Sequence, residues 1–472
     1  MTPHVQPLRR NNLARAGRPL SATSAVAPRP AFYLTVVFVF VVYGRFPEIM
    51  DMVTGSALHS ARIIVGLALL AMLLFGGDIR AVFSKVGVCL IAFTLWMLVC
   101  IPFSIWRGGS ARTLRDFWML SLFSFIIIAS AVQGFEQCRR IMYTLAAATV
   151  FIEIFALAMG RAQGGRVALL GGTLGNANYL ALVLLMGAPF CLFVIRTKPG
   201  LTPLKFACLL MLLCIPVTVA TTGSRGGLVT LVIMFVMYFV PLPSSQKVVV
   251  GSVAIILSLT AVAWSTRSAL DRLKTIFDTS APVRLSDSQQ SAIESMELRK
   301  DLLLSSLQLT MRHPLLGVGP GMFAVANANY VESATGRPDW NAWHETHNTF
   351  TQLSCEDGLP GFFLYCLALL FCFKIVLSIE KRTLQNPALS AVRHMAFSLR
   401  LALVAFTGTA FFASNAYMYY FPMLAGLCVA LARAGTERFS SQMPAGSEPD
   451  TGPQAHLLPQ FRAGTLSGGM TR

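Results

Sequence analysis

Residues 343–348, Trp-His-Glu-Thr-His-Asn, place two histidines, a glutamate and an asparagine close together. An imidazole with an ordinary pKa of about 6.5 exchanges protons near neutral pH, so His344 or His347 is a candidate base for an attacking hydroxyl, beside the amide of Asn348. A zinc protease is disfavoured because its HExxH motif places the histidines at i and i+4, whereas these lie at i and i+3. The simpler alternative is an exposed loop histidine without a chemical role.

Two arginines are candidates for binding an anion. Arg225 lies in Thr-Gly-Ser-Arg-Gly-Gly (222–227), between two long apolar segments that meet with almost no loop. An arginine at that depth costs about 2.5–3.5 kcal/mol on insertion scales, so its side chain either extends to the lipid headgroups or faces a polar cavity. The flanking glycines favour the cavity, because they let a ligand approach the backbone closely. Arg166 follows another apolar segment on the expected outer side and is the weaker candidate.

A third polar patch, Glu-Asp-Gly-Leu-Pro-Gly (356–361), stands at the start of an apolar segment. Glu356 follows His347 at a distance that does not guarantee contact, even if the intervening residues form a helix. We therefore expect Glu356 to orient another polar group, to cap a buried helix start, or to bind substrate.

Composition predicts a membrane protein. The chain is 55% hydrophobic and only 12% charged, about half the charged fraction that is usual in soluble domains. The net charge of +17 would suggest nucleic acid on a soluble protein, but here the basic residues lie in the tails and in short gaps between apolar segments. Ten cysteines without a CxxC pair indicate neither a zinc site nor a disulfide framework. We expect no metal, no cofactor and no nucleic-acid partner.

The apolar segments predict an all-α polytopic fold, since a spanning helix needs about 20 mainly apolar residues. We expect about twelve transmembrane helices by that criterion, at 31–50, 60–76, 86–106, 116–133, 141–160, 178–196, 204–222, 226–242, 247–265, 360–379, 393–413 and 417–433. Residues 1–30 and 434–472 are predicted to be disordered cytoplasmic tails, flanking helices one to nine (31–265) and ten to twelve (360–433). Basic connections on alternate sides support this orientation.

One connection, residues 266–359, is far longer than ordinary loops and is expected to be periplasmic. Within it, residues 292–312 place Met296, Leu303, Leu307 and Met311 at helical spacing, which predicts an amphipathic helix that lies along the membrane or caps the bundle. The glycines that follow, in His-Pro-Leu-Leu-Gly-Val-Gly-Pro-Gly (313–321), predict a turn. They complete neither a GxGxxG nor a Walker motif, so a nucleotide site is rejected.

Four segments together resemble the O-antigen ligase/polymerase superfamily of bacterial membrane glycosyltransferases. Each motif alone is weak, but their order around one long loop is specific, and the resemblance covers roughly residues 30–435. The motifs are Gly-Thr-Leu-Gly-Asn-Ala-Asn-Tyr (172–179), Thr-Gly-Ser-Arg-Gly (222–226), Arg299 followed by His-Pro-Leu-Leu-Gly-Val-Gly-Pro-Gly-Met-Phe (313–323), and His-Asn-Thr-Phe (347–350) with Glu-Asp-Gly-Leu-Pro-Gly (356–361).

The resemblance implies a metal-independent, inverting transfer of an undecaprenyl diphosphate-linked glycan to an acceptor hydroxyl at the periplasmic face of the inner membrane. Arg225 and Arg299 match the arginines that the family uses to hold the diphosphate, and His347 matches its loop histidine. Asn176 and Asn178 of the first motif become candidates for binding diphosphate or glycan. Two departures are the leucine at 303, where the family often has tryptophan, and the extra His344.

Several functions stay open at this point. The acceptor is lipid A-core in a ligase, a second lipid-linked glycan in a polymerase, and a serine or threonine in a protein O-oligosaccharyltransferase. The single large loop slightly favours ligase or polymerase. A polysaccharide or lipid transporter or flippase is the alternative from another class, although Glu153 is the main acidic residue deep in an apolar segment and no internal repeat is evident.

Overall fold

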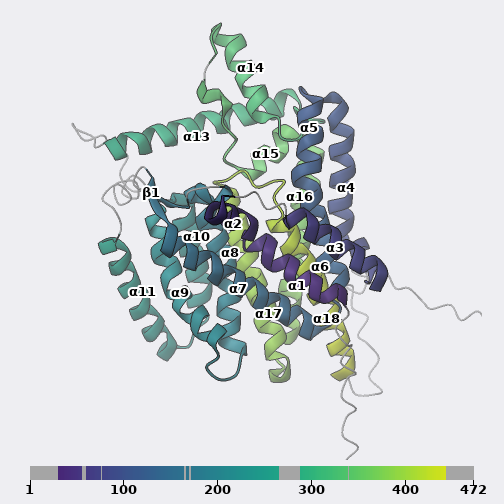
Figure 1. Ribbon diagram of the computed structural model, residues 1–472, viewed down its shortest axis with the longest axis vertical. Helices are drawn as coiled ribbons and strands as arrows, with labels where there is room; N and C mark the ends of the chain where they lie inside the picture. The colour runs from purple at the N-terminus through teal and green to yellow at the C-terminus, as the bar shows by residue number, and fades with distance from the viewer. Residues whose placement is uncertain are drawn as a thin grey trace, which may run out of the picture.

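The computed structural model describes residues 30–55, 60–75, 77–163, 166–169, 172–264, 287–338 and 340–442. Residues 1–29 of the predicted tail at 1–30, the start of the large loop at 265–286, and residues 443–472 of the predicted tail at 434–472 lie outside these residues. Residues 434–442 of the second predicted tail are helical. The described chain forms a bundle of long helices with a separate group of helices at one end (Figure 1). This agrees with the predicted polytopic helical class. A hairpin of two short strands is the only sheet in the described part of the chain.

The elements before the large loop are α1 (Pro30–Tyr43), α2 (Phe46–Thr54), α3 (Ser60–Phe75), η1 (Ile79–Phe83), α4 (Lys85–Cys100), η2 (Ile101–Phe103), α5 (Arg107–Thr113), η3 (Leu114–Trp118), α6 (Met119–Ala131), α7 (Phe135–Met159), β1 (Arg161–Gln163), β2 (Arg166–Ala168), η4 (Thr173–Gly175), α8 (Ala177–Thr197), α9 (Pro203–Thr221), α10 (Arg225–Phe239) and α11 (Ser244–Trp264). Those that follow are α13 (Asp287–Arg312), α14 (Phe323–Thr335), η5 (Trp340–Trp343), α15 (Thr349–Glu356), α16 (Gly358–Thr383), η6 (Pro387–Leu389), α17 (Ser390–Ala410) and α18 (Tyr420–Gln442).

Over the described residues, eight helices are long and apolar enough to cross a membrane, or nine if the bent pair α1 and α2 is one span. Two shorter apolar helices, Arg225–Phe239 and Tyr420–Gly435, accompany them. The chain is therefore a multi-pass membrane protein, while the expected count of about twelve spans by length stays a prediction. The most apolar stretch of α8 is 78% buried, whereas that of α11 is 6% buried, so α8 is central and α11 peripheral.

The first predicted span, 31–50, is broken rather than straight. α1 and α2 meet at a bend of 59°. Arg45, between them, has a left-handed backbone (φ +52°), and Pro47 cannot donate a hydrogen bond to the preceding turn. The bend therefore follows from these two residues.

The helices α13, α14 and α15 gather at one end of the bundle, here called the loop end (Figure 1). The predicted helix at 292–312 lies within α13. It packs on its neighbours through Leu302, Ser306 and Leu309, which are at most 5% exposed. The predicted apolar positions point elsewhere: Met296 is 38% exposed and Met311 is 81% exposed. The helix thus caps the bundle with a different face, and the membrane contact of the predicted face stays a prediction.

The glycine-rich turn after α13 is docked on α15. The amides of Val318 and Gly319 donate to the carbonyls of Cys355 and Glu356, at 2.8 and 2.9 Å. Gly319 has φ +108°, and a Cβ there would come within 2.0 Å of the Ser104 hydroxyl. Only glycine fits this close crossing. The turn therefore fixes the segment that follows α13 against the end of the large loop.

Candidate functional site

Three segments far apart in the sequence enclose one cavity of about 470 Å³ at the loop end, within the usual size range of small-molecule sites. The segments are the stretch from β2 to the start of α8, the first half of α13, and the turn before α15. The lining residues are Arg166, Ala168, Gly175, Asn176, Ala177, Asn178, Ser295, Leu298, Arg299, His344 and His347. No acidic residue is among them, so the cavity favours an anion. We call it the cationic cavity.

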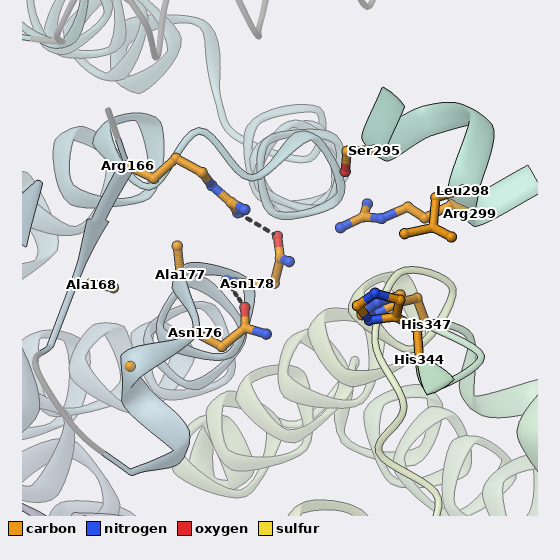
Figure 2. A pocket seen from close by; sticks show the side chains of 11 residues that line it. Arg166, Ala168, Asn176, Ala177, Asn178, Ser295, Leu298, Arg299, His344 and His347 are labelled. Atoms are coloured by element: carbon orange, nitrogen blue, oxygen red, sulfur yellow. Dashed lines mark hydrogen bonds between the residues drawn. The ribbon is translucent and has the colours of Figure 1, made fainter. Parts of the chain in front are cut away.

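Two arginines reach into the cationic cavity from opposite sides, with Asn178 between them (Figure 2). Arg166 comes from β2, which pairs with β1 in a tight antiparallel hairpin. Its Nε donates to the Thr222 carbonyl at 2.8 Å, and its second terminal nitrogen donates to Asn178 Oδ1 at 2.9 Å. Arg299 comes from the first half of α13 and is half-buried. Guanidinium groups are planar donors that suit a phosphate.

Asn176 and Asn178 shape the floor of the cavity at the start of α8. The Asn176 side chain caps the helix, because its Oδ1 accepts from the Asn178 amide at 2.9 Å. Asn178 in turn holds Arg166. The amide side chains therefore orient one of the two arginines in addition to lining the cavity.

His347 is held in an unusual backbone conformation at the cavity wall. Its φ is +52°, a left-handed value that costs a non-glycine residue about 1–3 kcal/mol. The surrounding contacts keep it there: the His347 amide donates to Ser414 Oγ at 2.9 Å, and Thr346 Oγ1 lies 3.1 Å from the same hydroxyl. Strained residues of this kind are concentrated at functional sites.

The environment keeps the His347 imidazole neutral. Burial, together with the positive charge of Arg299 and the neighbouring His344, lowers the pKa of His347 to about 4. A neutral imidazole can accept a proton near neutral pH without first losing one. His344 is more exposed than His347 and lines the same cavity.

Three of the predicted site residues lie outside the cavity lining. Arg225 is half-buried at the start of α10 and is linked to the cavity through Thr222, whose carbonyl accepts from Arg166. Asn348 caps α15, since its Oδ1 accepts from the amides of Phe350 and Thr351 at 2.9 and 3.2 Å. The structure thus brings Arg166, Arg299, both histidines and two asparagines together, but not Arg225, Asn348 or Glu356.

Glu356 belongs to a second, closed group with Asp357 and Tyr417, here called the acid cluster. Its carboxylate accepts from the Phe323 amide at 3.0 Å and from the Tyr417 hydroxyl at 2.8 Å. The same hydroxyl lies 2.7 Å from Asp357 Oδ2. Burial raises the pKa of Glu356 to about 7 and raises that of Asp357 well above its ordinary value. The acid cluster therefore joins α14, α15 and the segment before α18.

Some lining and supporting residues escape sequence reasoning. Ser295 and Leu298 precede Arg299 on α13 and carry no motif of their own. Ser414, which holds His347, lies in the short segment between α17 and α18, where only the break between two apolar runs is visible in the sequence. Over the described residues, no group of three or more His, Cys, Asp or Glu side chains is arranged to hold a metal ion.

A comparison with protein families finds a match between residues 206–366 and the family described as O-antigen ligase. The match confirms the resemblance to the O-antigen ligase/polymerase superfamily. It includes Arg225, Arg299 and His347 but begins after Arg166, Asn176 and Asn178, which form the remaining wall of the cavity. A comparison with curated proteins finds no match.

Proposed function

We propose that this protein is a membrane glycosyltransferase that moves a glycan from undecaprenyl diphosphate to an acceptor hydroxyl at the periplasmic face of the bacterial inner membrane. The observation that carries the proposal is the cationic cavity, in which Arg166 and Arg299 face each other beside a neutral His347. An O-antigen ligase-like domain over residues 206–366 supports the same substrate class.

The reaction exchanges one bond at the anomeric carbon of the donor sugar. The acceptor oxygen forms a bond to that carbon as the bond to the diphosphate oxygen breaks, and the diphosphate leaves with the electron pair. His347 receives the acceptor proton: its imidazole is neutral near pH 7, and the negative charge of a bound diphosphate would raise its lowered pKa toward the range of a useful base. Attack from the face opposite the leaving group inverts the anomeric configuration.

The arginines stabilise the charge that develops on the leaving diphosphate. Arg299 and Arg166 approach it from two walls of the cavity, and a donor fully engaged with the diphosphate, as proposed for Arg299, is worth about 2–4 kcal/mol in a transition state. Arg225 adds positive charge behind Arg166, on the segment whose Thr222 carbonyl holds that guanidinium. His344, Asn176 and Asn178 contact the diphosphate or the first sugars, and the lipid tail lies among the membrane helices.

The decisive experiment measures glycan transfer by the purified protein in lipid vesicles. Lipid diphosphate-linked glycan is the donor, and lipid A-core, a second lipid-linked glycan and a serine peptide are offered as separate acceptors. Arg299→Ala should lower transfer by about 30- to 1,000-fold, the equivalent of one lost donor. Arg312→Ala is the matched control, because Arg312 lies on the same helix but is exposed and contacts Tyr330.

The outcome also separates the alternatives. The acceptor that receives glycan distinguishes ligase, polymerase and protein O-oligosaccharyltransferase. Movement of the lipid-linked glycan across the membrane without transfer would identify a transporter or flippase instead. Equal transfer by Arg299→Ala and Arg312→Ala would show that the cavity is not the site of glycan transfer.

A further inference from the structure

Arg45, in the bend between α1 and α2, is a buried cation outside the cationic cavity. Its side chain is 8% exposed, and its backbone is left-handed with φ +52°. Burial of a charge and a left-handed backbone are both unfavourable for arginine, so compensating contacts must hold it. Those contacts lead to two different walls of the cavity.

The first set of contacts fixes the wall formed by residues 172–178. One terminal nitrogen of Arg45 donates to Thr173 Oγ1 at 3.2 Å and pairs with Glu48 Oε1 at 2.5 Å. Glu48 Oε2 accepts from the Thr173 amide at 3.0 Å. Gly172 has φ +61°, and a Cβ there would come within 2.7 Å of the Glu48 carboxylate. The Arg45–Glu48 pair therefore anchors the turn that leads to Asn176 and Asn178.

The second set of contacts fixes the wall that carries His347. Nε and the other terminal nitrogen of Arg45 donate to the Tyr420 hydroxyl at 3.2 and 2.6 Å. The guanidinium also lies 4.9 Å from the ring centre of Tyr419. Tyr419 ends the segment that contains Ser414, and Tyr420 begins α18. Ser414 accepts from the His347 amide at 2.9 Å. All three nitrogens of one guanidinium thus bind residues that precede or follow the two walls: Thr173 before Asn176, and Tyr420 six residues after Ser414.

We propose that Arg45 is a positioning residue, which sets the separation between the Asn176–Asn178 wall and His347 across the cavity. The inference rests on the proposed function, because the separation matters only if groups on both walls act on one substrate. Lysine retains the charge but lacks the planar fork, so it cannot bind Tyr420, Thr173 and Glu48 together. Arg45 would therefore affect the rate of transfer without contacting the donor.

The test compares Arg45→Lys with Arg433→Lys in the vesicle assay. Arg433 is a matched control on α18, because its guanidinium is also held by several bonds, to Asp78 at 2.8 Å and to the carbonyls of Ala129 and Val132 at 3.0 and 2.6 Å. At equal amounts of folded protein, Arg45→Lys should lower kcat by about 10- to 100-fold, as expected for a small misplacement of reacting groups. KM for the lipid-linked donor should change less than about threefold, since the arginines and histidines of the cavity remain. Arg433→Lys should change neither constant.

Hydrogen exchange gives a second measurement that does not depend on turnover. Arg45→Lys should accelerate amide exchange in residues 172–179 and 344–349 together, and Arg433→Lys in neither segment. Tyr420→Phe removes only the hydroxyl that Arg45 contacts and should accelerate exchange in the same two segments by a smaller amount. This variant replaces Arg45→Lys in the test if Arg45→Lys does not fold.

The two proposals fail in different ways. If the wild-type protein transfers no glycan, the proposed function fails. Amide hydrogen exchange in residues 172–179 and 344–349 still tests whether Arg45 links the two walls. If transfer is normal in the wild type but Arg45→Lys matches Arg433→Lys in kcat and exchange, Arg45 has no positioning role.

Discussion

The stretch from Trp343 to Gly361 contributes polar side chains to two places that handle charge in opposite ways. In the cationic cavity, His347 stands beside Arg299 with open space in front of it. In the acid cluster, Glu356 is fully enclosed, and its carboxylate is satisfied by the Phe323 amide and the Tyr417 hydroxyl. The first arrangement leaves charge available to a ligand, whereas the second uses charge to hold the fold together. A high density of polar residues in the sequence therefore does not identify a reactive site unless the direction of each side chain is known.

The largest expected effect separates the two histidines of the cavity. His347→Asn removes the imidazole but suits the left-handed backbone, so folding should be retained. Glycan transfer should fall by about 10²- to 10⁴-fold, the usual worth of a general base. His344→Asn is the control and should cost less than about tenfold in the same assay. Equal large losses in both variants would mean that both histidines are required, so that His347 could not be assigned alone as the base.

The acid cluster should respond in stability rather than in transfer. Glu356→Ala leaves the buried Phe323 amide without its partner, which costs about 1–3 kcal/mol, while the Tyr417 hydroxyl still contacts Asp357. The thermal transition should therefore move to a lower temperature, while transfer per folded molecule stays within about threefold of the wild type because no donor is lost from the cavity. Glu356→Gln, which keeps the shape and an acceptor, should lose less stability. A large loss of transfer in Glu356→Gln would bring the acid cluster into the chemistry.

Arg166 allows a finer comparison inside the cavity itself. Its guanidinium is already bonded to Thr222 and Asn178, so less of its donor capacity is available to a ligand than a fully open arginine would have. Arg166→Ala should lower transfer by about tenfold, corresponding to about 1.4 kcal/mol. Asn178→Ala should give a smaller loss of the same kind. If Arg166→Ala instead exceeds Arg299→Ala in effect, the diphosphate lies nearer to the α8 wall.

The smallest expected effects are opposite pH dependences of stability. The pKa of Glu356 is raised to about 7 in the folded protein, so its contribution is present below its ordinary pKa and is lost as pH rises toward 7. The pKa of His347 is lowered to about 4, so its contribution is present above its ordinary pKa and is lost as pH falls toward 4.

Melting curves of variants between pH 4 and pH 7.5 would resolve these two contributions. Relative to the wild type, Glu356→Gln should gain stability as pH rises through this range. His347→Asn should gain stability relative to the wild type as pH falls. Parallel curves for all three proteins would show that neither group titrates as its surroundings predict.

Much of the site could be predicted because several cavity-lining residues lie within the family motifs. Arg299, His347, Asn176 and Asn178 lie in motifs, and the structure brings them to one cavity. Asn348 could not be separated from them, since an asparagine before a helix serves equally well as a cap. Ser414 and Arg45 carry no motif, because their roles depend on neighbours more than sixty residues away in the sequence.

The fold shows the same division between local and distant information. Apolar segments predict the helices, and the basic gaps between them predict their ends. The bend at Arg45 was visible only as a charged interruption, because its partners Thr173 and Tyr420 belong to other segments. The apolar periodicity of α13 identified a helix but not the face that packs, since both faces carry apolar residues and the buried one also includes Ser306.

Because three segments of the chain line the cavity, exchanging one segment between related proteins would not transfer the whole cavity. The part that resembles O-antigen ligase, residues 206–366, supplies Arg299 and both histidines, whereas Arg166, Asn176 and Asn178 come from earlier in the chain. A chimera that exchanges only the later part would pair two walls of one parent with one wall of the other. Grafting residues 166–179 along with it would keep all three cavity-lining segments from a single parent.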